Sequence, residues 1–437
     1  MTIMTMTRMR RLLTSTLLLT LLVSSIGSAS ARLTKVAPNK FSQAKPPART
    51  HRFRIRTITA GVNLDSPGDL KTIESAIEFL QHASKRFTDE GYEIQTVRIA
   101  TQPFSQYLNG KSRAEALEGL KRIDEVLTAK NVILSIGPVI TADRHDPEFA
   151  AWAAQLIQQT KNISFSVTVA SERGIHTQAA LTAAEAIVAI SKASPGGEGN
   201  FRFAAAANVT PGPFFPTAYH RGPVGFSLGL ETPRLLQQAF EQGDGLKDLG
   251  AAQQKLFDLL ESELRPVEKL AEEVSRTERR EYFGIDVSPA PSKDASIGAA
   301  IEALTHAPFG ASSTLLACAA ITEVLKNLKI KICGYSGLML PVLEDPVLAT
   351  RAAEGRYTVR ELLLYSSVCG TGLDVVPLAG DTSVNDLAAL IRDVAALSSK
   401  LHKPLSARLF LIPGKKAGER AEFSNPFLTS SVIMKLE

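Results

Sequence analysis

The sequence has little cysteine, a single tryptophan and no long apolar run beyond its first residues, and each absence excludes a class of protein. Three cysteines, Cys318, Cys333 and Cys369, are too few and too scattered for a disulfide framework or a zinc ribbon. A membrane span needs about 20 apolar residues, and none follows the amino-terminal segment, so we expect no membrane contact after processing. A net charge of +5 over 437 residues, with no stripe of basic and aromatic residues, argues against nucleic acid as a partner.

Nucleotide and zinc-protease motifs are also absent. The glycines around Gly370 show neither the G-x-G-x-x-G spacing of a dinucleotide site nor the Lys-Ser/Thr pair of a P-loop. No two histidines are spaced as i and i+4, which excludes a zincin-type helix. The sequence therefore indicates no nucleotide cofactor.

The amino terminus has the three parts of a signal peptide in order. In MRRLLTSTLLLTLLVSSIGSASAR a basic start precedes an apolar stretch, and Ala29-Ser30-Ala31 supplies the small residues of a cleavage site. We expect residues 1–31 to be removed, leaving a secreted, periplasmic or secretory-lumen protein; the alternative is a membrane anchor formed by an uncleaved amino terminus. Residues 32–51 form a Pro/Lys-rich linker.

From residue 52 to residue 437 the pattern alternates between strands and helices, which predicts one large α/β domain with a mostly parallel sheet or a barrel. The expected strands are 53–64, 94–104, 132–140, 162–171, 281–292, 331–345 (strand, then loop) and 404–414. The expected helices are 69–91, 112–131, 147–160, 175–194, 232–279, 296–306, 313–328, 358–370 and 386–401. Candidate site residues fall where strands end, because the carboxyl edge of an α/β sheet is where sites form.

The stretch SSVCGTGLDVVPLAGDTS, residues 366–383, gathers glycines and two acidic residues around a short apolar run. Turns at Gly370 and Gly372 are expected to present Asp374, which has no helix start behind it and is a candidate acid–base group or ligand. A second turn presents Asp381, for which capping of the next helix is an equal alternative.

A second acidic pair, Glu344 and Asp345, follows an apolar run and precedes Pro346. Capping of the helix after Pro346 explains Asp345 and leaves Glu344 as the functional candidate. Carboxylates at strand ends are typical ligands of hard cations, so Asp374, Asp381 and Glu344 form a predicted site for a divalent ion such as Mg²⁺, Mn²⁺ or Ca²⁺.

Two further strand ends carry polar residues. Asp286, a candidate acid or base, and Ser288 stand at one, and Ser296 opens the next helix, whose amino terminus would receive an anion. Arg98 and Thr101 stand at the other, where Arg98 would clamp a carboxylate with two hydrogen bonds; an edge-strand arginine is the alternative.

Two nucleophile or base candidates remain. His220 lies in the Gly/Pro-rich loop PTAYHRGP, a suitable place for a base or metal ligand. Cys369 as a nucleophile would need a histidine and an orienting group, and its position at the end of an apolar helical run favours packing instead.

Several stretches together resemble one family, the uncharacterised domain-of-unknown-function family numbered 711. They are RTITAGVNL, VRIATQPF, FAAAANVTPGPFFPTAYH, FGIDVSPAPSKDASIG, LMLPVLED, SSVCGTGLDVVPLAGD and KPLSARLFLIPGKKAG, spread over nearly all of residues 52–437. The resemblance implies the ten-stranded α/β barrel of the pyruvate formate-lyase type, with helices outside. It does not bring glycyl-radical chemistry with it, because the radical enzymes' Arg-Val-Ser-Gly-Tyr-like loop is absent near the carboxyl end and Cys333-Gly334-Tyr335 lies mid-chain.

These observations favour an enzyme that acts on a small anionic molecule in a barrel-mouth pocket. Hydrolase or lyase chemistry, with or without a divalent metal, fits the absence of a redox or nucleotide motif. The alternative is an exported, non-catalytic protein that binds a metabolite or cation. The sequence leaves assembly into a homo-oligomer open.

Overall fold

A sheet of ten strands forms the centre of the computed structural model, which describes residues 51–212 and 216–436. The predicted signal peptide and all but the last residue of the predicted linker lie outside the described residues. Five neighbouring strands of the sheet run parallel: β1 (Arg54–Val62), β2 (Ile94–Thr101), β3 (Val132–Ile140), β4 (Ile163–Ser171) and β6 (Phe203–Ala207).

Two pairs of strands extend this group, in the order β8-β7-β1-β2-β3-β4-β6-β10-β9; each pair is parallel within itself and antiparallel to the central strands. The pairs are β7 (Gly225–Glu231) with β8 (Glu281–Pro289), and β10 (Leu405–Ile412) with β9 (Gly372–Ala379). A short strand, β5 (Gly174–Ile175), pairs with β4, and β11 (Arg420–Ala421) pairs with β12 (Ser431–Val432) in a separate sheet. Because the added pairs run opposite to the central five, their carboxyl ends lie beside the central strands' amino ends.

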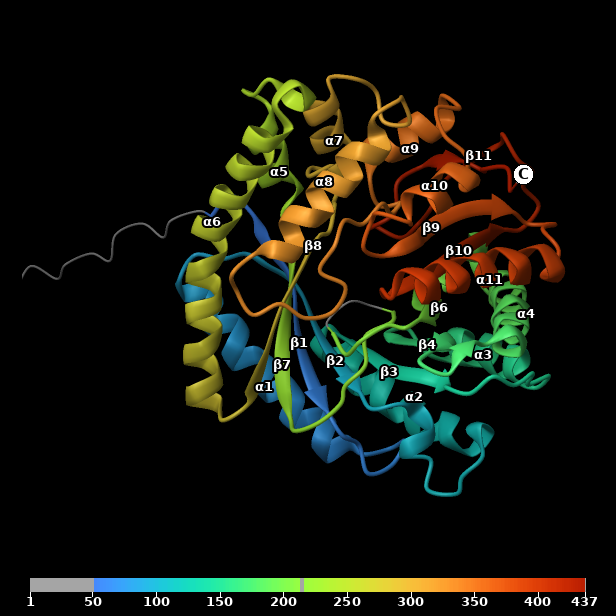
Figure 1. Ribbon diagram of the computed structural model, residues 1–437. Helices are drawn as coiled ribbons and strands as arrows, with labels where there is room; N and C mark the ends of the chain where they lie inside the picture. Colours follow the sequence, from blue (N-terminus) through green and yellow to red (C-terminus); the bar gives the residue numbers. More distant parts are fainter. Residues whose placement is uncertain (1–50, 213–215, 437) are drawn as a thin grey trace, which may run out of the picture. The chain divides into compact units, whose positions relative to one another are not determined.

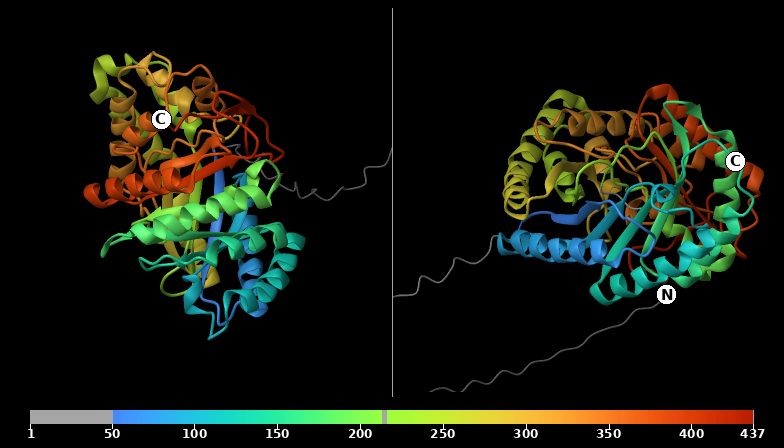
Figure 2. Two further views of the ribbon diagram at one scale, coloured as in Figure 1. Left: turned by 90° about the vertical axis from the view of Figure 1, so that its right-hand side faces the viewer. Right: turned by 90° about the horizontal axis from the view of Figure 1, so that it is seen from below.

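Helices surround the strands, which lie inside them in Figure 1 and in both views of Figure 2. Among the described residues, no helix combines the length and apolarity that a membrane crossing requires. The helices are α1 (Leu70–Asp89), α2 (Arg113–Lys130), α3 (Phe149–Gln159), α4 (Thr177–Ala193), α5 (Pro233–Phe240), α6 (Leu249–Glu278), α7 (Ile297–Thr305), α8 (Thr314–Asn327), α9 (Pro346–Ala353), α10 (Val359–Tyr365) and α11 (Val384–Leu401).

The central strands have one apolar and one polar face, as β4 illustrates. Its residues alternate, and Phe165 packs against the ring of Trp152 from α3 at 5.7 Å, on the helix-covered side. On the opposite face, Ser166 and Thr168 line a cavity. The same face of the other strands also carries polar side chains that line cavities: Thr59, Thr96, Arg98, Ser227, Asp374, Ser406 and Arg408. The sequence thus folds into an apolar shell around a polar interior.

Most of the expected elements are confirmed, but the strands β6, β7 and β9 were missed, and the helix expected over 232–279 is two helices. The two glycines of GFSLGLE weaken a strand pattern, and β7 forms because it pairs with β1 on one side and β8 on the other. The long helix divides into α5 and α6, since Gly243 and Gly245 interrupt it and Gly245 has a positive φ of 60°.

The expected strand at 331–345 was also wrong, and Asp374 lies in a strand rather than in a turn. Residues 331–342 make only isolated bridges, because Gly334 and Ser336 have positive φ values of 61° and 43°. The segment nevertheless touches both outer strands: Cys333 N donates to a carbonyl of β8 at 3.0 Å, and Val342 N to the Asp374 carbonyl of β9 at 3.2 Å. The helix expected to end at Gly370 ends at Tyr365.

Candidate functional site

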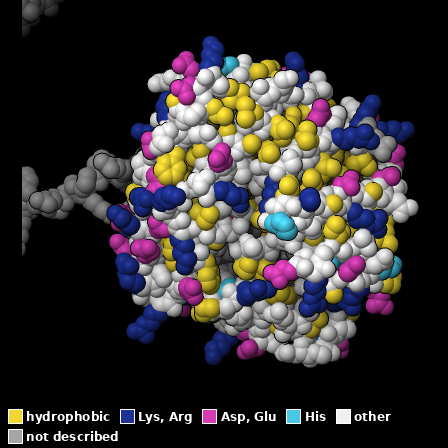
Figure 3. All heavy atoms as spheres, viewed as in Figure 1, with side chains coloured by type: hydrophobic (Ala, Val, Ile, Leu, Met, Phe, Trp, Pro, Cys, Tyr) yellow, Lys and Arg dark blue, Asp and Glu magenta, His cyan; other side chains and the backbone are white. Residues whose placement is uncertain are grey.

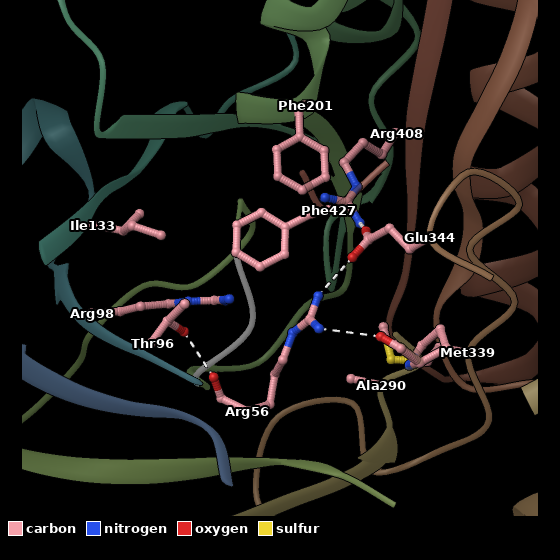
Figure 4. A pocket seen from close by; sticks show the side chains of 11 residues that line it. Arg56, Thr96, Arg98, Ile133, Phe201, Ala290, Met339, Glu344, Arg408 and Phe427 are labelled. Carbon is pink, nitrogen blue, oxygen red and sulfur yellow. Dashed lines mark hydrogen bonds and ion pairs between the residues drawn. The ribbon is translucent and has the colours of Figure 1, made fainter. Parts of the chain in front are cut away.

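Three buried arginines from three strands line one small cavity. Arg56 of β1, Arg98 of β2 and Arg408 of β10 are 6%, 7% and 4% exposed, and the cavity that they share has a volume of about 40 Å³. Figure 4 shows the three side chains entering from different sides. We call this the arginine pocket. It lies near the amino ends of β1, β2 and β3 and beside the carboxyl ends of the oppositely directed β7 and β8.

Glu344 bridges two of these arginines. Arg56 Nη2 donates to Glu344 Oε2 at 2.7 Å, and Arg408 Nη2 donates to Glu344 Oε1 at 2.6 Å. Arg408 also donates from its Nε to Asp374 Oδ1 at 2.6 Å, and Asp374 itself is not among the residues that line the pocket. Both carboxylates are buried, and charge-assisted bonds of this length hold guanidinium planes firmly. Two acids that the sequence separates by 30 positions thus meet through one arginine that was not predicted.

Aromatic rings complete the walls. Phe201, before β6, lies 4.8 Å from the Arg408 guanidinium carbon, and Phe427, near the carboxyl terminus, lies 5.6 Å from that of Arg56. A guanidinium over an aromatic face is stabilised by the ring's quadrupole, more so away from water. The rings therefore help to hold charged groups inside a largely apolar enclosure.

The electrostatics of the pocket favour an anion. Of the residues that the structure describes, the charged ones that line the pocket are three arginines and one glutamate. The pKa of Arg98 falls to about 9, first because the side chain is buried and then because Arg56 adds positive charge beside it, with Arg408 contributing in the same direction. Burial raises the pKa of Asp374, against the opposing charge of Arg408. A negative group in the cavity would favour the charged form of Arg98.

The outer surface differs from this interior. On the face shown in Figure 3, lysine and arginine side chains are interspersed with aspartate and glutamate. The concentration of arginine in the pocket is therefore a feature of the interior rather than of that face.

The predicted anion position at the start of α7 is filled by the protein's own Asp345. Ser296 caps α7 and donates its hydroxyl to Asp345 Oδ1 at 2.7 Å. The same carboxylate accepts hydrogen bonds from four backbone N–H groups, two at the start of α7 and two at the start of α9: those of Ile297, Gly298, Val347 and Leu348. Asp345 thus caps α9, as predicted, and also joins two helix starts.

Asp286 and Ser288 form a second carboxylate site satisfied from within the chain. Asp286 is fully buried and accepts bonds from the Ser288 hydroxyl at 2.6 Å and from Tyr335 N and Ser336 N at 2.8 and 2.9 Å. Burial raises its pKa, and these bonds oppose the rise. A side chain at Gly334 would collide with this carboxylate, so the close approach requires glycine there. The arrangement fixes the segment that runs between β8 and β9.

The remaining candidates lie apart from the arginine pocket. His220 lines a different cavity of about 260 Å³, where its Nε2 meets the Gly222 carbonyl at 3.0 Å and burial lowers its pKa. Thr101 is buried with its hydroxyl near that of Tyr107 at 3.1 Å. Cys369 is buried in the hydrophobic core.

The three carboxylates of the predicted metal site do not gather. Asp374 and Glu344 already accept bonds from arginines, and Asp381 is exposed beyond the far end of β9. Among residues 51–212 and 216–436, no group of three or more histidine, cysteine, aspartate or glutamate side chains is placed to hold a metal ion. Metal binding stays a prediction, and the positions of the oxygens do not fit it.

Sequence reasoning missed Arg56, Arg408 and both aromatic rings. The signal for the arginines was present, because each is a charged residue inside an otherwise uncharged part of a buried strand, as Arg98 is. Nothing in the sequence pattern indicates that Phe427, far from any strand of the sheet, returns to this pocket.

Comparison with known proteins gives a family but no activity. Residues 48–424 match the family described as uncharacterised ACR, DUF711. A UPF0210 protein from Pyrobaculum islandicum is 30% identical over 399 residues, which cover 84% of this chain and 86% of the relative. UPF0210 proteins from Syntrophobacter fumaroxidans and Lactobacillus delbrueckii subsp. bulgaricus are 27% and 25% identical, over 87% and 85% of this chain and 90% and 89% of theirs.

Proposed function

The chain belongs to the DUF711 family, and from its own site we propose that it is an enzyme that binds a small anionic metabolite in the arginine pocket. The observation that carries this proposal is the convergence of Arg56, Arg98 and Arg408 on one small cavity that, within the described ranges, a single carboxylate lines. Guanidinium groups match carboxylate and phosphate oxygens in pairs, and burial strengthens the attraction. The cavity holds no more than a small oxyanion or the anionic end of a larger molecule.

Glu344 is the proposed acid–base group, because it is the carboxylate that lines the cavity. Arg56 and Arg408 would orient it, and Asp374 would hold Arg408 in place from behind. Proton transfer at Glu344, with the anion held by Arg98, suits hydrolysis or elimination and needs no redox step. We include hydrolase or lyase chemistry and export by the amino-terminal signal in the proposal.

A non-catalytic binding protein is the second candidate, and one observation favours it. Both oxygens of Glu344 accept charge-assisted bonds from arginines, so this carboxylate already has a structural role in holding two guanidinium groups at the cavity. A binding protein needs no more than that role.

We also propose that the sheet closes into a barrel through residues 331–342. The support is that this segment is hydrogen-bonded to β8 near one end and to β9 near the other. A crystal structure in which water separates the segment from either strand would contradict closure.

Thermal unfolding in acetate, oxalate, phosphate and sulfate tests anion binding. At a concentration of 100 times Kd, a ligand adds about 2.7 kcal/mol, or roughly 3–5 °C in Tm. We expect at least one anion to do this for the wild type and for Arg276→Met, an exposed control on α6, but not for Arg98→Met. If none of the four anions raises Tm, or if Arg98→Met responds like the control, the pocket does not bind anions.

Incubation with a mixture of small carboxylic and phosphorylated acids, followed by mass spectrometry, separates the two functions. An enzyme consumes at least one compound, and Glu344→Gln does not. Retention of a compound that is never consumed would favour the binding protein.

A further inference from the structure

A second cavity lies at the opposite end of the parallel strands. Its volume is about 470 Å³, which is within the range of small-molecule sites. Thr141 after β3, Ser166 and Thr168 of β4, Asn208 after β6 and Tyr219 from the following loop line it. We call it the carboxyl-edge cavity. It shares Pro211, Tyr219 and Arg221 with the 260 Å³ cavity that His220 lines and, among the described residues, shares none with the arginine pocket.

Two hydroxyls on one face of β4 are directed at this cavity with hydrogen-bonding capacity to spare. Within the described part of the chain, the side chains of Ser166 and Thr168 make no hydrogen bond, although Ser166 is only 1% exposed. Buried hydroxyls in proteins are nearly always hydrogen-bonded to protein, water or ligand. Each hydroxyl can donate one hydrogen bond and accept others, as the hydroxyls of a polyol can.

Neighbouring polar groups are already engaged and are fixed in position. Tyr219 donates its hydroxyl to the Val209 carbonyl at 3.2 Å, and Asn208 donates its amide to Ser398 at 3.0 Å. These bonds leave acceptor positions on the Tyr219 and Asn208 oxygens, so a ligand hydroxyl has defined partners on two sides.

The charged residues of the rim add an excess of positive charge. Arg173 and Arg221 are exposed at the edge of the cavity, and Glu172 is the carboxylate among its lining residues. An anionic group on the outer side of a ligand would meet these arginines, while its hydroxyls reach the face of β4.

We propose that the carboxyl-edge cavity binds a small polyhydroxylated anion, with its hydroxyl groups on Ser166 and Thr168 and its carboxylate or phosphate toward Arg173 and Arg221. This site is separate from the arginine pocket, and the proposal does not depend on the function proposed above.

Isothermal titration calorimetry with three probes tests the site: gluconate, which has hydroxyls and a charge; glucose, which has hydroxyls alone; and acetate, which has charge alone. The proteins are the wild type, Thr168→Val, Ser166→Ala, Arg221→Gln and the exposed control Thr88→Val on α1. Arg98→Met is added because a carboxylate could also enter the arginine pocket. Circular dichroism verifies that each variant is folded, and the two β4 variants provide independent tests.

We expect gluconate to bind the wild type, Thr88→Val and Arg98→Met alike, and more tightly than glucose or acetate. Loss of a single neutral hydrogen bond should weaken binding about two- to tenfold in Thr168→Val and in Ser166→Ala. Arg221→Gln should reduce the preference for gluconate over glucose. The proposal is overturned if gluconate does not bind, if neither β4 variant weakens it, or if Arg98→Met abolishes it.

Discussion

Glu344 and Asp345 are neighbours in the chain and both are buried, yet they belong to two different regions of the molecule. Glu344 lies between two arginine side chains at a cavity. Asp345 faces the other way and is surrounded by backbone N–H groups at the starts of two helices. Asp374 resembles Glu344, because its partner is the side chain of Arg408. Asp286 resembles Asp345, because its partners are backbone N–H groups and a serine.

The difference lies in what satisfies the carboxylate. Backbone donors are fixed by the fold, so a carboxylate that they satisfy stabilises the fold and has little capacity left for a ligand. Side-chain donors at a cavity can also contact an incoming molecule, because a guanidinium has five N–H groups. The partner of a buried carboxylate is therefore a better guide to its role than its burial or its place after a strand.

The largest expected effect is at the backbone-held carboxylates. Asp345→Ala removes the acceptor of four backbone N–H groups and the Ser296 hydroxyl. With about 1–3 kcal/mol for a buried group left unsatisfied, we expect a loss of about 4 kcal/mol or more in the free energy of unfolding. Urea denaturation measures it. A loss below about 1 kcal/mol would show that the helix starts do not need this carboxylate.

Arg408→Met is expected to lower the free energy of unfolding slightly less, by about 3–5 kcal/mol. The reason is that it leaves Glu344 and Asp374 with one fewer cation. The double variant Arg408→Met with Asp374→Asn should recover part of that loss, since it removes one uncompensated charge. No recovery in urea denaturation would mean that Arg408 acts through packing on Phe201 rather than through its charge.

The smallest expected effect on the free energy of unfolding concerns His220. Its ring contacts a backbone carbonyl, so we group it with Asp345 and Asp286, whose partners include backbone groups. Burial lowers its folded-state pKa below the unfolded value of 6.5, so the unfolded state binds more protons between the two values. The free energy of unfolding therefore decreases as the pH falls below about 6.5, by at most about 1.4 kcal/mol per pH unit. His220→Gln should flatten this part of the curve of unfolding free energy against pH and leave anion binding unchanged. A steeper curve in the variant would contradict the assignment.

Local patterns predicted most elements of the fold. The capping box at Ser112, the continuous apolar run of β3 and the Asp345-Pro346 helix start all have their signals within a few residues. The misses have physical causes: the strand β7 contains two glycines, and residues 331–342 look like a strand but have positive φ values at Gly334 and Ser336. Pairing partners, rather than propensity, decide such segments.

The site was predicted in part. Glu344 and Arg98, chosen from the sequence because they stand at the ends of predicted strands, line one pocket, and Asp374 contacts that pocket through Arg408; their function stays a prediction. Arg56 and Arg408 could have been found as charged residues inside buried strands. The separation of Glu344 from Asp345, and the return of Phe427, depend on contacts between distant parts of the chain, which the sequence pattern does not specify.

One measurement tests the central distinction most directly: calorimetric titration of oxalate into two matched variants, Glu344→Gln and Asp345→Asn. We expect Glu344→Gln to bind oxalate at least about tenfold more tightly than the wild type, a difference of about 1.4 kcal/mol, because it removes the carboxylate that lines the arginine pocket. Asp345→Asn should lower the free energy of unfolding and leave Kd unchanged. If Asp345→Asn changes Kd as much as Glu344→Gln does, or if Glu344→Gln leaves it unchanged, Glu344 does not belong to an anion site and the account is wrong.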